Sequence, residues 1–108
     1  MFDRFKKVVR VFKEQCPLAF TVVVRRVLLV GLDGYCEKKG KRFFIAINKD
    51  LDENRAIDTL VHEWAHGRAW NHLMDVASKE DFDRRVHDAS WGVAYAEVYR
   101  IYEATILP

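Results

Sequence analysis

Two histidines four residues apart constrain this 108-residue chain more than any other feature of its sequence. His62 and His66 flank Glu63 in the pattern His-Glu-x-x-His. On an α-helix, residues i and i+4 lie one above the other on the same face, so both imidazoles can reach one ion. Glu63 lies about 100° further round the helix, beside that ion, where it can take a proton from a water. The pattern therefore predicts a binding site for a zinc ion (Zn²⁺), with Glu63 as general base.

The residues around this motif favour a buried helix over a chance match on a surface helix. They form a wide apolar stripe at helical spacing, and the first turns carry cap-type residues and negative charge. The apolar positions are Ala56, Ile57, Leu60, Val61, Trp64, Ala65 and Ala69, and the polar ones are Asp52, Asn54 and Asp58. We expect a polar connection over residues 48–54 and a helix that continues to about Met74.

Length and composition predict one compact domain over residues 1–108. Half of the residues are hydrophobic and 13% are aromatic, which is enough for one core and too little for two. Arg25 and Arg26 interrupt the longest apolar run, so no membrane span is expected. Because no signal peptide is recognisable and Cys16 and Cys36 lack CxxC spacing, we expect reduced thiols in a cytoplasmic protein.

The net charge of +2 hides an asymmetry between the two halves. Residues 1–49 contain twelve Lys/Arg and four Asp/Glu, while residues 50–108 contain six and twelve, so the halves carry +8 and −6. Mutual attraction of the halves is the favoured interpretation. The alternative is a basic surface for nucleic acid or an acidic protein, formed by the positive residues within 4–13 and 38–42.

Hydrophobic periodicity predicts further elements before the motif helix. A basic amphipathic helix should end at Pro17 and pack onto a sheet. Its apolar positions are Phe2, Phe5, Val8, Val9 and Phe12. Residues 21–30 are rich in β-branched side chains and predict a strand, which Arg25 and Arg26 mark as bulged or as an exposed edge.

Two more strands are expected in a hairpin that leads into the motif helix. Residues 35–37 and 42–47 flank a basic turn in which Gly40 supplies a positive φ. We expect the second arm, residues 43–47, to be a sheet edge beside the cleft, because a free edge can pair with an extended peptide.

After the motif helix, residues 81–86 predict a short helical segment and residues 89–104 a long final helix. Asp88 is the candidate N-cap of the final helix. Its apolar stripe should lie against the motif helix and comprises Trp91, Ala94, Tyr95, Val98, Ile101 and Tyr102.

A catalytic zinc usually takes three protein ligands, so the two histidines need a partner. His72 has the spacing of HExxHxxGxxH, but Ala69 replaces the glycine of that pattern, and a continuous helix turns His72 about 120° away from His66. Glu97 lies in the final helix, which should pack near the site. His87 stands at a loop-to-helix junction, from which its ring can reach the motif helix. We favour His87, with Glu97 and His72 as alternatives.

Two segments carry a resemblance to a known family. His-Glu-Trp-Ala-His at 62–66 and His-Asp-Ala-Ser-Trp-Gly at 87–92 resemble the SprT-like zinc metallopeptidases, in particular their short bacteriophage forms. The resemblance covers about residues 42–104. The elements expected along the chain make up an α+β domain with an N-terminal helix, a small and mostly antiparallel sheet of about three strands, the motif helix and a packed C-terminal helix. The resemblance implies that this domain is minimal and zincin-like. It also implies zinc ligation by His62, His66 and His87.

The implied activity is hydrolysis of a peptide bond in a protein or peptide substrate, in the host cytoplasm if the chain is phage-encoded. Glu63 acts as the base, and Tyr95 or Tyr99 is a candidate for stabilising the oxyanion. Two rival functions are a non-catalytic zinc-stabilised module that binds a phage or host partner, and a nucleic-acid-associated protein. Glu63 favours the enzyme, since a structural zinc site normally closes all four positions with protein ligands. The sequence does not indicate an oligomeric state.

Overall fold

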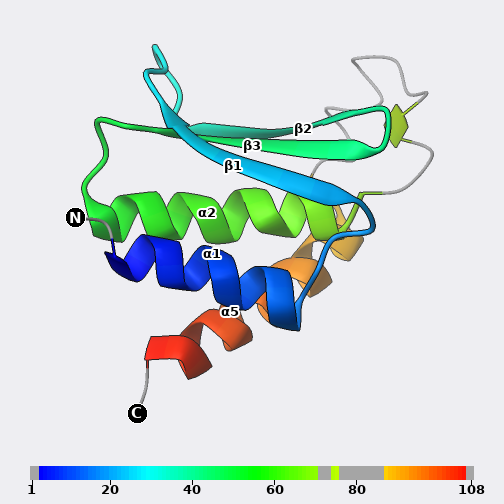
Figure 1. Cartoon of the computed structure of the whole chain (residues 1–108). Coiled ribbons are helices and arrows are strands. Elements are labelled where there is room, and N and C mark those ends of the chain that lie inside the picture. The colour runs from blue at the N-terminus through cyan, green and yellow to red at the C-terminus, as the bar shows by residue number, and fades with distance from the viewer. Residues whose placement is uncertain (1–2, 71–73, 76–86, 107–108) are drawn as a thin grey trace.

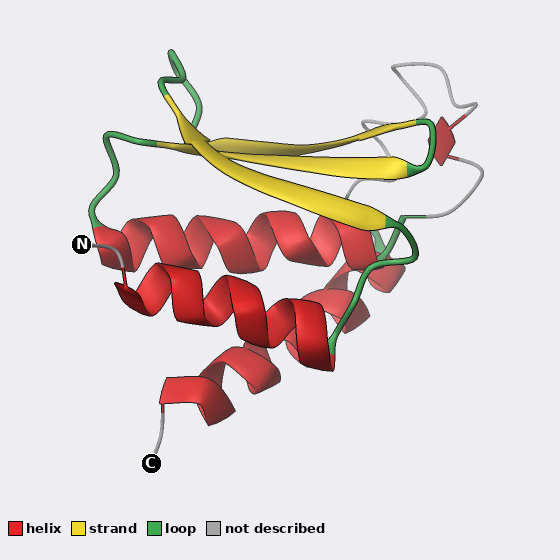
Figure 2. Ribbon diagram, in the orientation of Figure 1, coloured by secondary structure: helices red, strands yellow, loops and turns green. Residues whose placement is uncertain are grey.

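The computed structural model describes residues 3–70, 74–75 and 87–106. Over these residues the chain forms a three-stranded sheet and three helices, which confirms the expected α+β class. The elements are α1 (Asp3–Gln15), β1 (Thr21–Val27), β2 (Gly34–Lys39), β3 (Arg42–Asn48), α2 (Glu53–Arg68) and α5 (Ala89–Ile106). All three helices lie on one side of the sheet, with α1 beside α2 and α5 below both (Figure 1, Figure 2).

The sheet is mixed, with the strand order β1-β3-β2. β1 runs parallel to β3 with Val22 opposite Phe43, and β2 runs antiparallel to β3 with Cys36 opposite Ile45. The expectation that residues 43–47 form a free edge is therefore wrong, because β3 is paired on both sides. Its side chains at 43, 45, 46 and 47 are all buried, as is usual for a central strand. The edge strand that contacts α2 is β2.

The first strand lies at the opposite edge of the sheet, which is one of the two interpretations, a bulge or an exposed edge, that Arg25 and Arg26 left open. It ends at Val27, three residues earlier than expected, and residues 28–33 form a loop. The guanidinium of Arg26 explains part of this geometry, because its Nη2 donates to the carbonyl oxygens of Asn48, Lys49 and Leu51 at 3.2, 3.1 and 2.7 Å. These contacts attach β1 to the connection between β3 and α2.

The hairpin and the helix starts agree with the sequence. Gly40 turns the chain between β2 and β3 with φ +59°. Asp52 caps α2 by accepting a hydrogen bond from the Arg55 N–H at 2.9 Å. Asp88 caps α5 in the same way, with the N–H groups of Ser90 and Trp91 at 3.0 and 3.2 Å from its Oδ1.

The core lies between the sheet and the helices and is centred on Trp64, which is fully buried. Its Nε1 donates to the Cys16 carbonyl at 2.9 Å, and its ring lies 5.4 Å from that of Phe12 on α1. α1 joins this core through Phe5, Val8 and Phe12, and it packs against α2 and α5. Both cysteines are free thiols, as expected.

α2 ends at Arg68, with Ala69 as its C-cap, and not near Met74 as expected. Packing after the helix accounts for this early end. The Trp70 ring lies edge-on to Phe43 of β3 at 5.9 Å, and its Nε1 donates to Asp75 at 2.8 Å. Tertiary contacts of Trp70 therefore outweigh the helix propensity of Ala69.

Charged residues of the two halves meet at the surface. Arg4 lies 3.8 Å from Glu53, and Lys38 lies 2.9 Å from Asp75. Both pairs join the basic first half to the acidic second half. Within the residues described, no helix has the length and apolar character that a membrane span needs.

Candidate metal centre

Three histidines converge at the C-terminal half of α2. The Nε2 atom of His62 lies 3.1 Å from that of His66 and 3.3 Å from that of His87. One ligand atom from each of the three falls within 4.8 Å of the others. Two nitrogen ligands on a tetrahedral zinc, each about 2.0–2.1 Å from the ion, lie roughly 3.3 Å apart. The two distances from His62 match this spacing, and the three imidazoles together form a group that could hold a metal ion such as zinc.

Local structure explains why these rings meet. His62 and His66 are one turn apart on α2, so the helix itself places them on one face. His87 immediately precedes α5, and the cap that Asp88 provides fixes the direction in which that helix begins. The packing of α5 against α2 then brings His87 to the other two.

An aromatic side chain lies against all three imidazoles. The ring centroid of Trp91, in the first turn of α5, is 5.1 Å from His62, 5.5 Å from His66 and 4.8 Å from His87. The ring of Tyr95 follows at 5.1 Å from Trp91. Trp91 was expected in the apolar stripe of its helix and as the aromatic residue of the 87–92 segment, without a contact to the histidines. Its contacts show that it also packs against the histidine cluster.

Of the two alternative ligands, Glu97 does not join the cluster. Glu97 accepts a hydrogen bond from Nε of Arg68 at 2.7 Å, and Nη1 of the same arginine donates to the Pro17 carbonyl at 2.6 Å. Glu97 thus forms an ion pair that ties α5 to the end of α2. His72 lies outside the described residues.

Burial shifts the pKa values of two neighbouring residues of α2, His62 and Glu63. Burial, followed by the charge of His87, lowers the pKa of His62. A neutral imidazole is the form that binds a metal. Burial also raises the pKa of Glu63 to about 7, and only 7% of this residue is exposed. A carboxyl with a pKa near neutrality is well matched to accept and return a proton.

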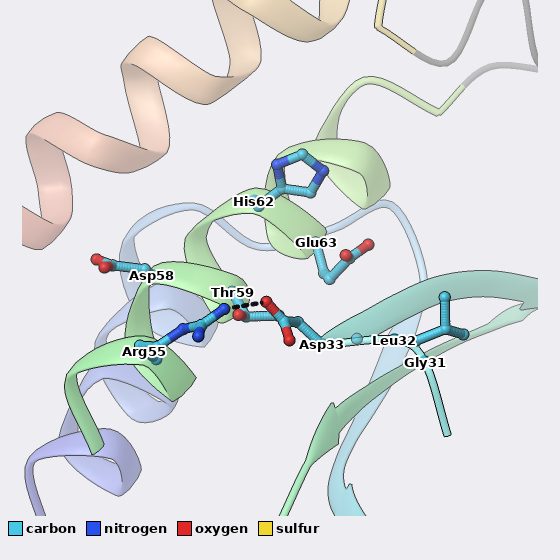
Figure 3. A pocket seen from close by; sticks show the side chains of 9 residues that line it. Gly31, Leu32, Asp33, Arg55, Asp58, Thr59, His62 and Glu63 are labelled. Carbon is cyan, nitrogen blue, oxygen red and sulfur yellow. Dashed lines mark hydrogen bonds and ion pairs between the residues drawn. The ribbon is translucent and has the colours of Figure 1, made fainter. Parts of the chain in front are cut away.

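A pocket of about 620 Å³ opens beside His62. One wall is formed by the end of the loop before β2, at residues 31–33, and by Gly34, the first residue of β2; the other is the adjoining face of α2 (Figure 3). Its α2 residues are Arg55, Asp58, Thr59, His62 and Glu63. Arg55 crosses from the helix to Asp33 of the loop, with an Nη2–Oδ2 distance of 2.6 Å. His62 and Glu63 therefore adjoin a space large enough for several atoms of a bound molecule.

The sequence did not indicate this pocket. Asp33 lies between Gly31 and Gly34 in a stretch for which no role in a site was expected, although the ladder of Arg55, Thr59 and Glu63 at spacing four could have marked the second face of α2. The two tyrosines considered for an oxyanion, Tyr95 and Tyr99, do not line the pocket.

Comparisons with protein-family models, with curated proteins and with solved structures found no match to this chain.

Proposed function

We propose that this chain is a zinc-dependent metallopeptidase of the SprT-like type. The observation that carries the proposal is the convergence of three histidines, with the Nε2 atoms of His66 and His87 at 3.1 and 3.3 Å from that of His62 and the buried carboxyl of Glu63 in the adjoining pocket. Three imidazoles leave one position of a tetrahedral ion for a non-protein ligand, which is typical of catalytic zinc and not of structural zinc.

The proposed reaction is hydrolysis of a peptide bond. Bound zinc would supply Lewis acidity, polarising the scissile carbonyl and acidifying the attacking water. Glu63 takes a proton from that water, and the oxygen of the water bonds to the carbonyl carbon of the substrate. The carbon–nitrogen bond then breaks, and Glu63 returns the proton to the leaving amine. His62, His66 and His87 hold the ion, and Trp91 restricts the movement of their rings.

The substrate backbone has a natural partner in β2. In the part of the chain that the structure describes, this strand is an edge of the sheet and contacts α2, and its first residue, Gly34, lines the pocket. An extended peptide added to such an edge is held through main-chain hydrogen bonds. β2 takes the role that the sequence assigned to β3. We further propose a cytoplasmic location, in a host cell if the chain is phage-encoded, which agrees with two free cysteines.

An assay with zinc-loaded protein and an unfolded protein substrate tests the proposal. Glu63→Gln should reduce cleavage by about 10²-fold or more, because the amide cannot accept a proton at neutral pH. Zinc content should stay at the wild-type level. Glu97→Gln is the matched control, since it makes the same chemical change outside the histidine cluster, and it should retain activity.

Two results would count against this function. Cleavage by Glu63→Gln at the wild-type rate would exclude Glu63 as the base. Full zinc occupancy without any hydrolysis by the wild type, over a broad set of unfolded proteins, would favour the non-catalytic zinc module.

A further inference from the structure

The loop between β1 and β2 exposes aliphatic side chains to solvent. Leu28, Val30 and Leu32 are 60, 92 and 52% exposed. The loop projects beyond the sheet on the side away from the helices (Figure 1). Single exposed apolar residues are common, whereas exposed apolar residues that gather in one place indicate a binding surface, and here three lie within five residues at the tip of one loop.

This loop is held in place by hydrogen bonds at its base. The side-chain amide of Asn48 donates to the carbonyl oxygens of Leu29 and Leu32, both at 2.9 Å. The backbone N–H groups of Asn48 and Lys49 donate to the carbonyl oxygens of Asp33 and Val27, respectively, at 2.8 and 2.9 Å. Gly31 turns the chain at φ +75°. The aliphatic side chains are therefore presented by a preorganised backbone, which lowers the entropy lost when a partner binds.

The tip is continuous with the proposed catalytic pocket. Gly31 and Leu32 line that pocket opposite His62 and Glu63, and the Arg55–Asp33 ion pair joins the loop to α2 (Figure 3). Leu32 thus belongs both to the pocket and to the exposed apolar tip, which continues along the same loop to Val30 and Leu28. This shared residue favours, as the occupant of the tip, the same polypeptide that occupies the pocket.

We infer that residues 28–32 form a substrate-recognition element that binds an aliphatic or aromatic side chain of the polypeptide cleaved at the neighbouring site. The inference rests on the proposed peptidase function and narrows its substrate class to chains that expose apolar residues, such as unfolded proteins. Folded proteins bury those side chains and do not offer them to the tip.

Binding and cleavage of one set of peptides test the inference. The peptides are fluorescent, unstructured and identical except for a Leu or a Ser at each position in turn. Affinity is measured by fluorescence anisotropy with zinc-loaded Glu63→Gln, so that binding is read without cleavage. Val30→Ser and Leu32→Ser are added to this background. The matched control is Val93→Ser, because Val93 on α5 is 73% exposed and does not line the pocket.

We expect one Leu position at which replacement by Ser weakens binding about tenfold, the order expected when half of an aliphatic side chain is buried. Val30→Ser and Leu32→Ser should each remove most of that preference, and Val93→Ser should leave it unchanged. The tip side chains are exposed, so all variants should keep the wild-type melting temperature.

The other possible results either overturn the inference or separate it from the proposed peptidase function. Equal affinities for the Leu and Ser peptides, or no peptide binding, would remove the recognition element. Tip-dependent binding to vesicles of equal parts phosphatidylcholine and phosphatidylglycerol, with peptide affinity unchanged, would assign the tip to a lipid surface instead. Cleavage by the wild type without an apolar preference would overturn the recognition element and leave the peptidase intact. Tip-dependent peptide binding without cleavage would support the element and contradict the peptidase.

Discussion

Substitution of Gly34 by alanine tests the contact between β2 and α2 on which the pocket depends. A Cβ atom at this position would lie 2.7 Å from the Ala46 carbonyl oxygen and 2.7 Å from Cγ2 of Thr59. The carbonyl belongs to the central strand β3, next to the residue paired with Gly34, and cannot withdraw without disturbing the sheet. Thr59 is on α2 and lines the pocket. The added methyl group must therefore push β2 away from its neighbours.

Overpacking of this kind costs about 1–3 kcal/mol. Replacement of a glycine recovers about 0.4–1 kcal/mol by restricting the unfolded chain, and the net loss is roughly 1–2 kcal/mol. In a domain of this size we expect the midpoint of thermal unfolding to fall by about 4–12 °C. Circular dichroism melts and urea titrations of the purified protein measure this change.

Two companion variants make the Gly34→Ala result specific. Adding Thr59→Ser removes Cγ2, so the double variant should recover part of the loss. Gly92→Ala is the matched control, because a Cβ there meets nothing within 4 Å and alanine is favoured by about 0.5–1 kcal/mol inside a helix. An unchanged or raised melting temperature for Gly34→Ala would refute the described packing of β2 on α2.

Three further predictions concern the helix cap, the thiols and the metal. Asp88→Ala should lower the free energy of unfolding by about 1 kcal/mol through the lost N-cap of α5, and it should also weaken zinc binding by releasing His87. Asp88→Asn should retain both the stability and the zinc affinity. Equal zinc affinities for the alanine variant and the wild type would contradict the link between cap and ligand. Burial, with Glu63 and Glu37 nearby, raises the pKa of Cys36 from 9.0 to about 12, so its thiolate appears only as the pH approaches 12. Alkylation at pH 8 should then be about 10³-fold slower than in urea-unfolded protein and should accelerate about tenfold per pH unit; rapid labelling of folded protein at pH 8 would contradict the burial of this thiol. Removal of zinc by a chelator should lower the melting temperature, because the ligands join α2 to the start of α5; an unchanged melt after verified removal would exclude an integral metal site.

The helices could be predicted from the sequence because their signals are local. Asp52 and Asp88 cap α2 and α5 through N–H groups two or three residues further on, and such contacts are encoded in a short stretch. The end of α2 could not be predicted. It depends on the contact of Trp70 with Phe43, which lies far away in the sequence.

The sheet shows the same division between local and non-local information. The β2–β3 hairpin follows from Gly40 and its flanking residues, whereas the parallel pairing of β1 with β3 joins segments separated by the whole of β2. Residues 43–47 carried a signal that was interpreted wrongly. Their uninterrupted apolar run indicates a strand buried on both faces, and hence a central strand.

The candidate site also combines a feature that is encoded locally with features that depend on tertiary packing. The spacing of His62 and His66 places them on one face of a helix without any tertiary information. The approach of His87, the pairing of Glu97 with Arg68 and the pocket wall at residues 31–34 all depend on how distant segments pack. The sequence could rank the possible third ligands, but only the packing of α5 on α2 brings one of them to the other two histidines.

Zinc affinity of His87→Ala and Glu97→Ala tests the central claim most directly. Both variants are compared with the wild type by competition with a chromogenic chelator, and cobalt is substituted for zinc to report the ligand geometry by its visible absorption. We expect a large loss of affinity and an altered cobalt spectrum for His87→Ala, with wild-type behaviour for Glu97→Ala. Wild-type affinity and spectrum in His87→Ala would contradict a metal centre formed by His62, His66 and His87.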